Sequence, residues 1–526
     1  MKVLFVEPPR RLWPYMNYED NFLVKQSYLA LAANLRANGF PDVHILDCMP
    51  LKMGWKSLAA ELRTRQPDVV CVGENHALYA NEALKLLRLA KAVLPHVVTV
   101  AGGAHFTHLA DTYLGASPAG RSSPPPPWLA PGPPVADYVV KGEGDLTLVE
   151  LLQAVADHKL PPTHVPGLAF VADGAVVHTA PRPLVADLDS LPLPAYDLVP
   201  MDRYGRASLL FSPGGTTIHH SRGCAHACKF CVWWTQMACR TLEPDGTEQL
   251  HPRWRTKSVE RTVEEVELLA HKYRKQGLVF VDDCFNLDPR WNARFSQALV
   301  EHKLKCNWFA FVRADYLVRD HASGVLEQMA RAGLSHVSIG VERAEDEKLT
   351  DFSKRNYSAD ITRQAFSILK QHHPQVFRQA TFIVGLPDET RESMQRQLDF
   401  ARALDLDYPG FHPLTPVPGT ALWNEAITAG LIEARDFTEF DWATPVIRSR
   451  TLTRREIEES LIDLGKRYVT LPWVLRGLTS PGAYKRAMYR WFVKVSASMT
   501  LDLARNALLR PKGPLAPLVT PKWYDR

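Results

Sequence analysis

Two successive series of short apolar segments, each followed by a stretch with helical periodicity, restrict this chain of 526 residues to an α/β fold. In the first series, the sequence predicts strands at Val3–Val6, Val43–Leu46, Val69–Val72, Val97–Ala101 and Tyr138–Val140. Helices are expected between them, at Tyr28–Asn38, Trp55–Thr64 and Ala80–Leu94. Strands that alternate with helices in this way form a parallel, doubly wound sheet.

Small and polar residues follow three of these strands. The segments are Gly73-Glu74-Asn75, Gly102-Gly103-Ala104-His105 and Gly142-Glu143-Gly144-Asp145. Ligands of an open parallel sheet bind outside the carboxyl ends of its strands. The sequence therefore predicts a ligand site at this edge.

The second series begins after residue 205. Its expected strands are Thr216–His219, Gly277–Val281, Asn307–Val312, His336–Gly340, Gln379–Val384 and Tyr408–Pro413. Six β/α units in about 200 residues fit a partial TIM-like (β/α)6 barrel, with its active site at the strand carboxyl ends. From about Asp436 the pattern turns helical, at Arg454–Tyr468 and Tyr484–Leu509. The expected units are therefore residues 1–195, a barrel at 205–430 and a mostly helical region at 431–526.

Prolines are concentrated in residues 117–134, SPAGRSSPPPPWLAPGPP, inside the first unit. The run Pro124–Pro127 excludes helix and favours extended polyproline II. Such a segment can be a ligand for a partner protein, but we favour a surface loop inserted before the Tyr138 strand. Residues 184–204, with three further prolines, are expected to be an ordered linker.

The sharpest motif is Cys224-Ala-His-Ala-Cys228-Lys-Phe-Cys231, directly after the first barrel strand. Three thiolates on one short loop can hold three irons of a [4Fe–4S] cluster and leave the fourth iron open to a small molecule. A zinc site with His226 or Cys239 as the fourth ligand is the alternative, but zinc sites usually show paired CxxC spacing. We therefore favour the cluster.

This CxxxCxxC motif, with Phe230 before its third cysteine, resembles the defining motif of the radical S-adenosylmethionine (SAM) superfamily. The resemblance implies that SAM chelates the open iron and is cleaved reductively to methionine and a 5′-deoxyadenosyl radical. It also implies an electron donor such as flavodoxin or ferredoxin. Motifs at the ends of later barrel strands carry the further residues that the resemblance assigns to SAM, namely Asp282, Arg313, Glu342 and Gly385.

The first unit resembles the Rossmann-like cobalamin-binding domain of cobalamin-dependent radical SAM enzymes. A flat corrin needs small residues against it, because only these let the backbone approach closely. The resemblance implies cobalamin contacts from Gly73, Gly102, Gly103, His105, Gly142, Glu143 and Gly144. The DxHxxG motif that supplies a lower histidine ligand to cobalt in other cobalamin modules is not matched, because Met49 stands where that histidine would be. For His105 we favour a place at the corrin edge or a structural role.

Three functions follow as hypotheses. The first is a cobalamin-dependent radical SAM methyltransferase that acts on an unactivated carbon of a small molecule. The second is an oxidation like that of the anaerobic magnesium-protoporphyrin monomethyl ester cyclase, which Gln379–Thr390, Asp436–Pro445 and Leu452–Glu456 resemble. A large apolar or tetrapyrrole substrate would suit Trp233 and Trp234. The third is a cobalamin and iron–sulfur binding protein without turnover.

Composition limits the remaining possibilities. A formal net charge of +5 is too small for a nucleic-acid-binding surface on so long a chain. The first residues contain only a four-residue apolar run, which is too short for a secretory signal. No apolar run approaches the ~20 residues of a membrane span. The sequence therefore predicts a cytoplasmic protein without a transmembrane segment.

Overall fold

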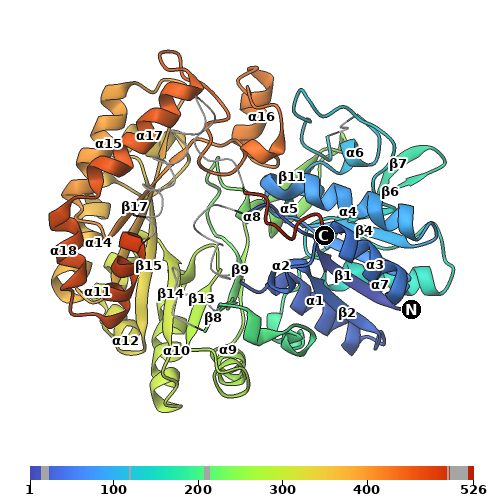
Figure 1. Ribbon diagram of the computed structural model, residues 1–526, viewed down its shortest axis with the longest axis horizontal. Coiled ribbons are helices and arrows are strands. Elements are labelled where there is room, and N and C mark those ends of the chain that lie inside the picture. The colour runs from blue at the N-terminus through green and yellow to red at the C-terminus, as the bar shows by residue number, and fades with distance from the viewer. Residues whose placement is uncertain (13–22, 118–119, 206–213, 495–496, 498–518) are drawn as a thin grey trace.

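The computed structural model describes residues 1–12, 23–117, 120–205, 214–494, 497 and 519–526. It contains two α/β units, one built on each series of strands, and Figure 1 shows them facing each other. The first unit lies on the right of that view and the second on the left. Segments from the carboxyl-terminal part of the chain pack against both units.

The first unit has a seven-stranded sheet in the order β2-β1-β3-β4-β5-β6-β7. The strands are β1 (Val3–Glu7), β2 (Val43–Asp47), β3 (Val69–Gly73), β4 (Val98–Gly102), β5 (Tyr138–Val140), β6 (Leu168–Ala172) and β7 (Ala175–His178). The first five pair in parallel, which confirms the predicted Rossmann-like sheet. The antiparallel hairpin β6–β7 was not predicted. Its signal was present as Asp173-Gly174, whose positive φ angles of 49° and 77° are those of a tight hairpin turn.

Helices cover both faces of this sheet because the buried strands carry apolar residues on both sides. Along β1, Val3 and Phe5 belong to the core under α1 and α7, whereas Leu4 and Val6 belong to the core under α3 and α4. The helices of this unit are α1 (Gln26–Ala37), α2 (Cys48–Leu51), α3 (Trp55–Arg65), α4 (Ala80–Val93), α5 (Gly103–His108), α6 (Ala110–Tyr113) and α7 (Asp145–Ala156).

The second unit has a six-stranded parallel sheet whose strands follow one another in the order β8-β13-β14-β15-β16-β17. They are β8 (Gly215–Ile218), β13 (Gly277–Phe280), β14 (Asn307–Val312), β15 (Leu334–Glu342), β16 (Phe377–Val384) and β17 (Tyr408–Pro413). The helices between and beside them are α9 (Val259–Glu267), α10 (Pro289–Glu301), α11 (Ala314–Ala322), α12 (Val325–Arg331), α13 (Asp346–Asp351), α14 (Ala359–His372), α15 (Arg391–Ala403) and α16 (Ala421–Thr428). The sequential order of parallel strands confirms the predicted partial barrel.

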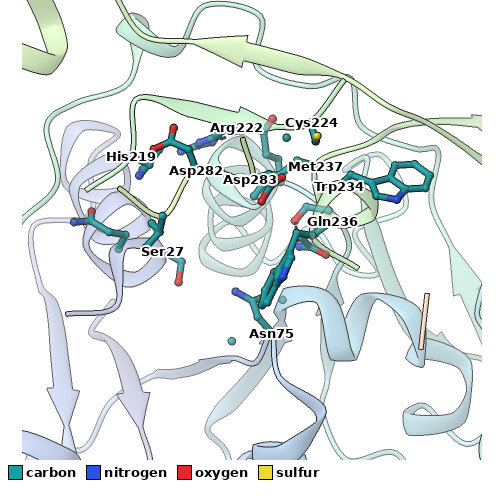
Figure 2. Close-up of a pocket in the computed structure, with 18 of the residues that line it drawn as sticks. Ser27, Asn75, His219, Arg222, Cys224, Trp234, Gln236, Met237, Asp282 and Asp283 are labelled. Atoms are coloured by element: carbon teal, nitrogen blue, oxygen red, sulfur yellow. Dashed lines mark hydrogen bonds and ion pairs between the residues drawn. The ribbon is translucent and has the colours of Figure 1, made fainter. Parts of the chain in front are cut away.

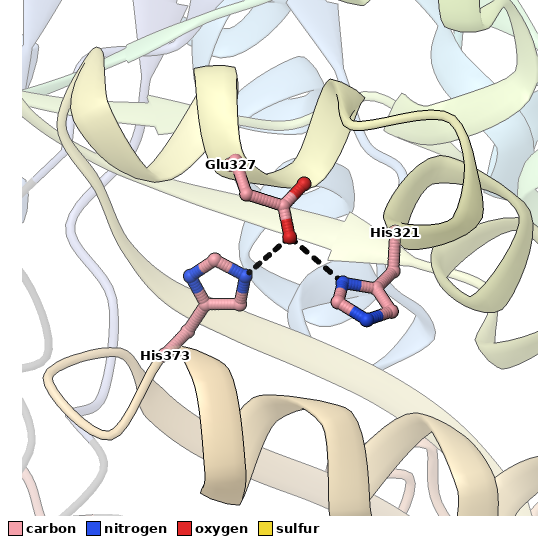
Figure 3. Close-up of side chains that lie close together, drawn as sticks. All are labelled: His321, Glu327 and His373. Carbon is pink, nitrogen blue, oxygen red and sulfur yellow. Dashed lines mark hydrogen bonds and ion pairs between the residues drawn. The ribbon is translucent and has the colours of Figure 1, made fainter.

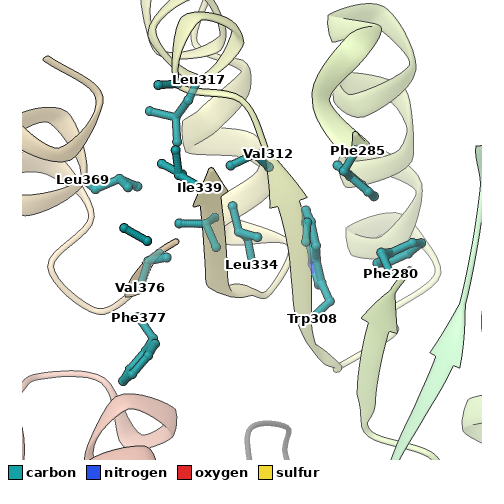
Figure 4. Packing of buried hydrophobic residues seen from close by; sticks show 14 of the residues in the cluster. Phe280, Phe285, Trp308, Val312, Leu317, Leu334, Ile339, Leu369, Val376 and Phe377 are labelled. Atoms are coloured by element: carbon teal, nitrogen blue, oxygen red, sulfur yellow. The ribbon is translucent and has the colours of Figure 1, made fainter. Parts of the chain in front are cut away.

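The core of the second unit is a continuous layer of aromatic and aliphatic side chains between strands and helices. Figure 4 shows part of it, with Phe280, Phe285 and Trp308 beside Val312 and Leu317. The rings of Phe285 and Trp308 lie 5.1 Å apart, and Trp308 is fully buried. This packing positions the carboxyl ends of β13, β14 and β15.

Four short strands, one directly before the cysteine motif and three after it, were not predicted. β9 (Ser221–Gly223) pairs with β12 (Trp254–Thr256), and β10 (Cys239–Leu242) pairs with β11 (Glu248–His251). α8 (Trp233–Gln236) lies between β9 and β10. The strands are three or four residues long and mostly polar, so their sequence carries little periodic signal.

The described part of the proline-rich insertion forms a loop before β5, and this loop also contacts another part of the chain. Residues 118–119 lie outside the described part, but the following residues contact the segment after β17. Ser123 accepts a hydrogen bond from Gly419 N at 2.9 Å, and Pro124 O accepts one from Trp423 Nε1 at 2.8 Å. The Trp128 ring lies 5.6 Å from that of Phe437. The insertion therefore joins the two units.

The carboxyl-terminal part is helical at α17 (Arg454–Tyr468), α18 (Leu471–Leu478) and residues 483–494. Tyr489 and Lys485 bind Asp407, beside β17, at 2.8 and 2.7 Å, so this part packs on the barrel. The rest of the helix expected up to Leu509 falls on residues outside the described part, except 497. Among the described residues, no helix is long and apolar enough to cross a membrane.

Candidate active site

One cavity of about 710 Å³ lies between the carboxyl ends of the two sheets. Most of the residues that the sequence singled out line it, as Figure 2 shows for Cys224 and Asp282. From the first unit these are Gly73, Gly102, Gly103, Gly142, Glu143 and Gly144. From the second unit they are Cys224, Cys228, Phe230, Cys231, Asp282, Arg313 and Glu342. Of the predicted residues, only His105 and Gly385 do not line the cavity.

The cysteine loop is held by its own backbone and by its neighbours. Gly223 has φ +78°, and a side chain there would overlap Arg253 O, so only glycine fits directly before Cys224. Cys231 N donates to Cys228 O at 3.1 Å, and Trp234 Nε1 donates to the same oxygen at 3.2 Å. The three thiols therefore face one space from one short loop, the donor set that a [4Fe–4S] cluster requires.

The zinc alternative lacks part of its ligand set. Cys239 belongs to β10 and does not line the cavity. His226 lines the cavity, with its Nε2 3.0 Å from the Tyr316 hydroxyl. The arrangement of three cysteines without a fourth cysteine from this segment fits the cluster.

Asp282 anchors the strand that leads into the cysteine loop. Its Oδ1 accepts hydrogen bonds from Ser221 N at 2.6 Å and Ser221 Oγ at 2.5 Å. Its Oδ2 is buried without a hydrogen-bond partner in the described structure, as is Oδ2 of the neighbouring Asp283. Burial and the Asp282 charge raise the pKa of Asp283 to about 7. Asp283 also lines the cavity, and the acidic pair that ends the strand was its sequence signal.

Arg313 and Glu342 end neighbouring strands and are both paired. Arg313 Nε lies 3.0 Å from Asp315 Oδ1. Glu342 has φ +63°, next to a register shift between β15 and β16, and its carboxylate lies 2.7 Å from Lys354 Nζ. Glu342 raises the pKa of Lys354 against the opposite effect of burial. Lys354 lines the cavity and was missed, because it lies on a loop without a motif.

Glycines form the opposite wall, where the first sheet ends. Gly73 and Gly102 are register partners on β3 and β4. Gly103 has φ +84°, and an added Cβ would lie 2.5 Å from Glu74 O. Gly142 has φ +71°, and an added Cβ would lie 2.9 Å from Arg240 Nη1. The wall is thus bare backbone over several residues, as a flat macrocycle needs.

Comparison with known proteins agrees with this geometry. Residues 218–401 match the radical SAM superfamily, and residues 25–120 match the B12 binding domain. The chain is a cobalamin-dependent radical SAM enzyme. Its cofactors are a [4Fe–4S] cluster, SAM and cobalamin, and its type is that of the methyltransferases or the cyclases. The hypothesis of a binding protein without turnover is therefore not supported.

Two relatives illustrate the two types. An uncharacterized methyltransferase of Pyrococcus horikoshii is 29% identical over 80% of this chain and 82% of its own length. The anaerobic magnesium-protoporphyrin IX monomethyl ester cyclase of Cereibacter sphaeroides is 26% identical over 92% of this chain and 74% of its own. The solved structure of the radical SAM methyltransferase TsrM from Kitasatospora setae shares the fold, with a TM-score of 0.66 and 17% identity over 97% of this chain and all of TsrM.

In this radical SAM enzyme, Glu143 lines the cavity, and its carboxylate also pairs with arginines of the second unit. Arg222, two residues before Cys224, lies 2.8 Å from both Glu143 and Asp145. Arg255 on β12 lies 2.9 Å from Glu143. These buried ion pairs connect the glycine wall to the cysteine loop.

His105 and Gly385 have structural places in the enzyme. His105 is buried, its Nε2 lies 2.6 Å from the Tyr113 hydroxyl, and its ring lies 4.7 Å from that of Phe437. Burial lowers the pKa of His105 to about 4. Gly385, with φ +75°, turns the chain after β16 and donates its N–H to Glu389 at 2.8 Å. Neither residue lines the cavity. The corrin contact of His105 and the adenine contact of Gly385 stay predictions.

Proposed function

We propose that this enzyme methylates an unactivated carbon of a small molecule. One cavity, lined by the three cysteines on one side and by the glycine wall on the other, carries the proposal. When bound, SAM at the cluster supplies a hydrogen-abstracting radical, and cobalamin supplies the methyl group. A single shared space would allow both cofactors to reach the same substrate carbon, and bound cofactors would displace water from it.

The roles of the chain's residues follow from their places. Cys224, Cys228 and Cys231 would hold the cluster. Arg313 and the Glu342–Lys354 pair, at the ends of β14 and β15, would hold the polar groups of SAM. Asp282 would fix the loop through Ser221, with its second oxygen free for the ligand.

The glycine wall of Gly73, Gly102, Gly103, Gly142 and Gly144 would carry the corrin. We place the cobalamin-binding unit at 1–195, the radical SAM unit at 205–430 and the helical region at 431–526. A reduced flavodoxin or ferredoxin is the electron donor that we propose.

Relatives support methylation without deciding it. Besides the Pyrococcus horikoshii protein, the hopanoid C-3 methylase of Methylococcus capsulatus is 25% identical over 86% of this chain and 77% of its own length. A cyclase-type oxidation of a tetrapyrrole is the second candidate. The cyclase relative covers more of this chain, and the indole rings of Trp233 and Trp234 line a mainly apolar cavity.

The test measures anaerobic SAM cleavage in the absence of the substrate that is methylated. The full chain, loaded with iron, sulfide and cobalamin, receives SAM and a strong reductant, and mass spectrometry quantifies 5′-deoxyadenosine and S-adenosylhomocysteine. Both products are expected, and Cys224→Ala should lose the deoxyadenosine. Cys306→Ala is the matched control, because Cys306 does not line the cavity. Deoxyadenosine without S-adenosylhomocysteine would contradict methylation and favour the cyclase reaction.

A further inference from the structure

Two histidines and a glutamate meet on the outer side of the barrel, away from the cavity. His321 lies near the end of α11, Glu327 in the first turn of α12, and His373 directly after α14. Figure 3 shows both imidazole rings directed at one carboxylate oxygen. Glu327 Oε1 lies 2.8 Å from His321 Nδ1 and 3.6 Å from His373 Nε2. One ligand atom from each residue lies within 4.8 Å of the other two.

The hydrogen-bonding capacity of this group is not used up. The His373 side chain is only 5% exposed, yet its Nε2 has no hydrogen-bond partner in the described structure. The second oxygen of Glu327, Oε2, is likewise buried without a partner there. A buried polar atom without a partner lowers the stability of the folded protein unless a bound water or ion supplies that partner.

Two imidazole nitrogens and one carboxylate oxygen are a set that binds zinc, with water in the fourth position. Bonds of about 2.0–2.2 Å to a central ion would place the three ligand atoms slightly more than 3 Å apart. The separations of 2.8 and 3.6 Å need only small side-chain movements to reach this geometry. We propose that His321, Glu327 and His373 bind one divalent transition-metal ion, for which Zn²⁺ is the expected species.

The position of the site indicates a structural ion. α11 and α14 run back from the carboxyl ends of the strands, so their last turns lie at the opposite end of the barrel from the cavity. An ion there would join α11, α12 and the end of α14. α11 begins directly after Arg313, which lines the cavity, so the ion would also fix the helix that follows this residue. Binding to the folded state alone would raise thermal stability by mass action.

Zinc content and zinc ligation test the site in the intact holoenzyme. The full chain with its cluster and cobalamin is freed of loose metal, incubated with Zn²⁺ and filtered, and zinc is counted by mass spectrometry. X-ray absorption then identifies the donor atoms. The wild type should hold about one zinc per chain with nitrogen and oxygen donors near ~2.0 Å, without the ~2.3 Å sulfur shell of a cysteine site. The midpoint temperature of thermal unfolding should rise when Zn²⁺ is added.

Substitutions at the site separate binding from misfolding. His373→Ala should lower zinc affinity by at least about tenfold. Glu327→Gln should lower it as well, although glutamine has nearly the same shape as glutamate. His302→Ala is the matched control, because His302 forms a histidine–glutamate pair with Glu267 at 2.7 Å but has no third ligand near it in the described structure. Iron content, cobalamin content and circular dichroism report folding. Equal zinc affinity in wild type and Glu327→Gln, or a shell of sulfur donors, would overturn the proposal.

Discussion

Replacing Arg222 by alanine should weaken the connection between the two units. The guanidinium lies 2.8 Å from both Glu143 and Asp145, and the three side chains are 10%, 4% and 5% exposed. The two nearby carboxylates raise the pKa of Arg222, so it stays charged although it is buried. Its removal leaves Asp145 as a buried carboxylate without that partner.

The magnitude follows from the pairs that remain. Removing one partner of a buried ion pair costs about 3–5 kcal/mol. Arg255 still lies 2.9 Å from Glu143, so the loss falls mainly on Asp145. We therefore expect a decrease of about 3 kcal/mol in the free energy of unfolding, which is roughly a hundredfold in the equilibrium constant. Arg222→Lys keeps the charge but not the fork of donors and should lose less.

Urea unfolding of the full chain, followed by tryptophan fluorescence, measures this change, and cobalamin retained after gel filtration measures its effect on the first unit. Arg294→Ala is the control, because Arg294 pairs with Glu260 and both side chains are about two-thirds exposed. This variant should change stability by less than about 0.5 kcal/mol. A loss below about 1 kcal/mol for Arg222→Ala would refute the argument that the buried pair joins the units.

Three further predictions concern other parts of the structure. Gly103→Ala should cost about 1–3 kcal/mol of stability and reduce bound cobalamin, since φ is +84° and Glu74 O blocks a side chain; cobalamin absorbance per chain measures this. Trp423→Phe should cost about 1–2 kcal/mol by losing the 2.8 Å bond to Pro124 O, and limited proteolysis should cut residues 117–134 faster than in the wild type. Burial raises the pKa of Asp47 from 3.8 to about 7, so the folded state binds the extra proton and stability should fall as pH rises from about 4 to about 7. Asp47→Asn should reduce this dependence of stability on pH, which urea midpoints measured at several pH values report. The same dependence in the wild type and in Asp47→Asn would contradict the prediction.

Much of the fold was predictable because its signals are local. Each of the five parallel strands of the first sheet was placed within one residue at its start and end, since apolar runs between turn residues have few other readings. The hairpin β6–β7 and strands β9–β12 were missed because short, polar or edge strands gain stability from pairing rather than from their own pattern.

The candidate site was predictable to the extent that its residues belong to motifs. Cys224, Cys228 and Cys231 are close in space because they are close in sequence. Lys354 carries no local pattern, and only the packing of its loop against the end of β15 brings it to Glu342. Composition could not reveal this pairing.

The sequence by itself determined the strand and helix series, the cysteine loop and the glycines, because spacing along the chain is enough to specify their local geometry. The tertiary structure alone decided how these parts meet. It directed His105 to Tyr113 and joined Glu143 to Arg222 and Arg255. It also brought together His321 of α11, Glu327 of α12 and His373, which directly follows α14. The physical reason is that long-range contacts depend on the packing of whole elements, and no short segment contains that information.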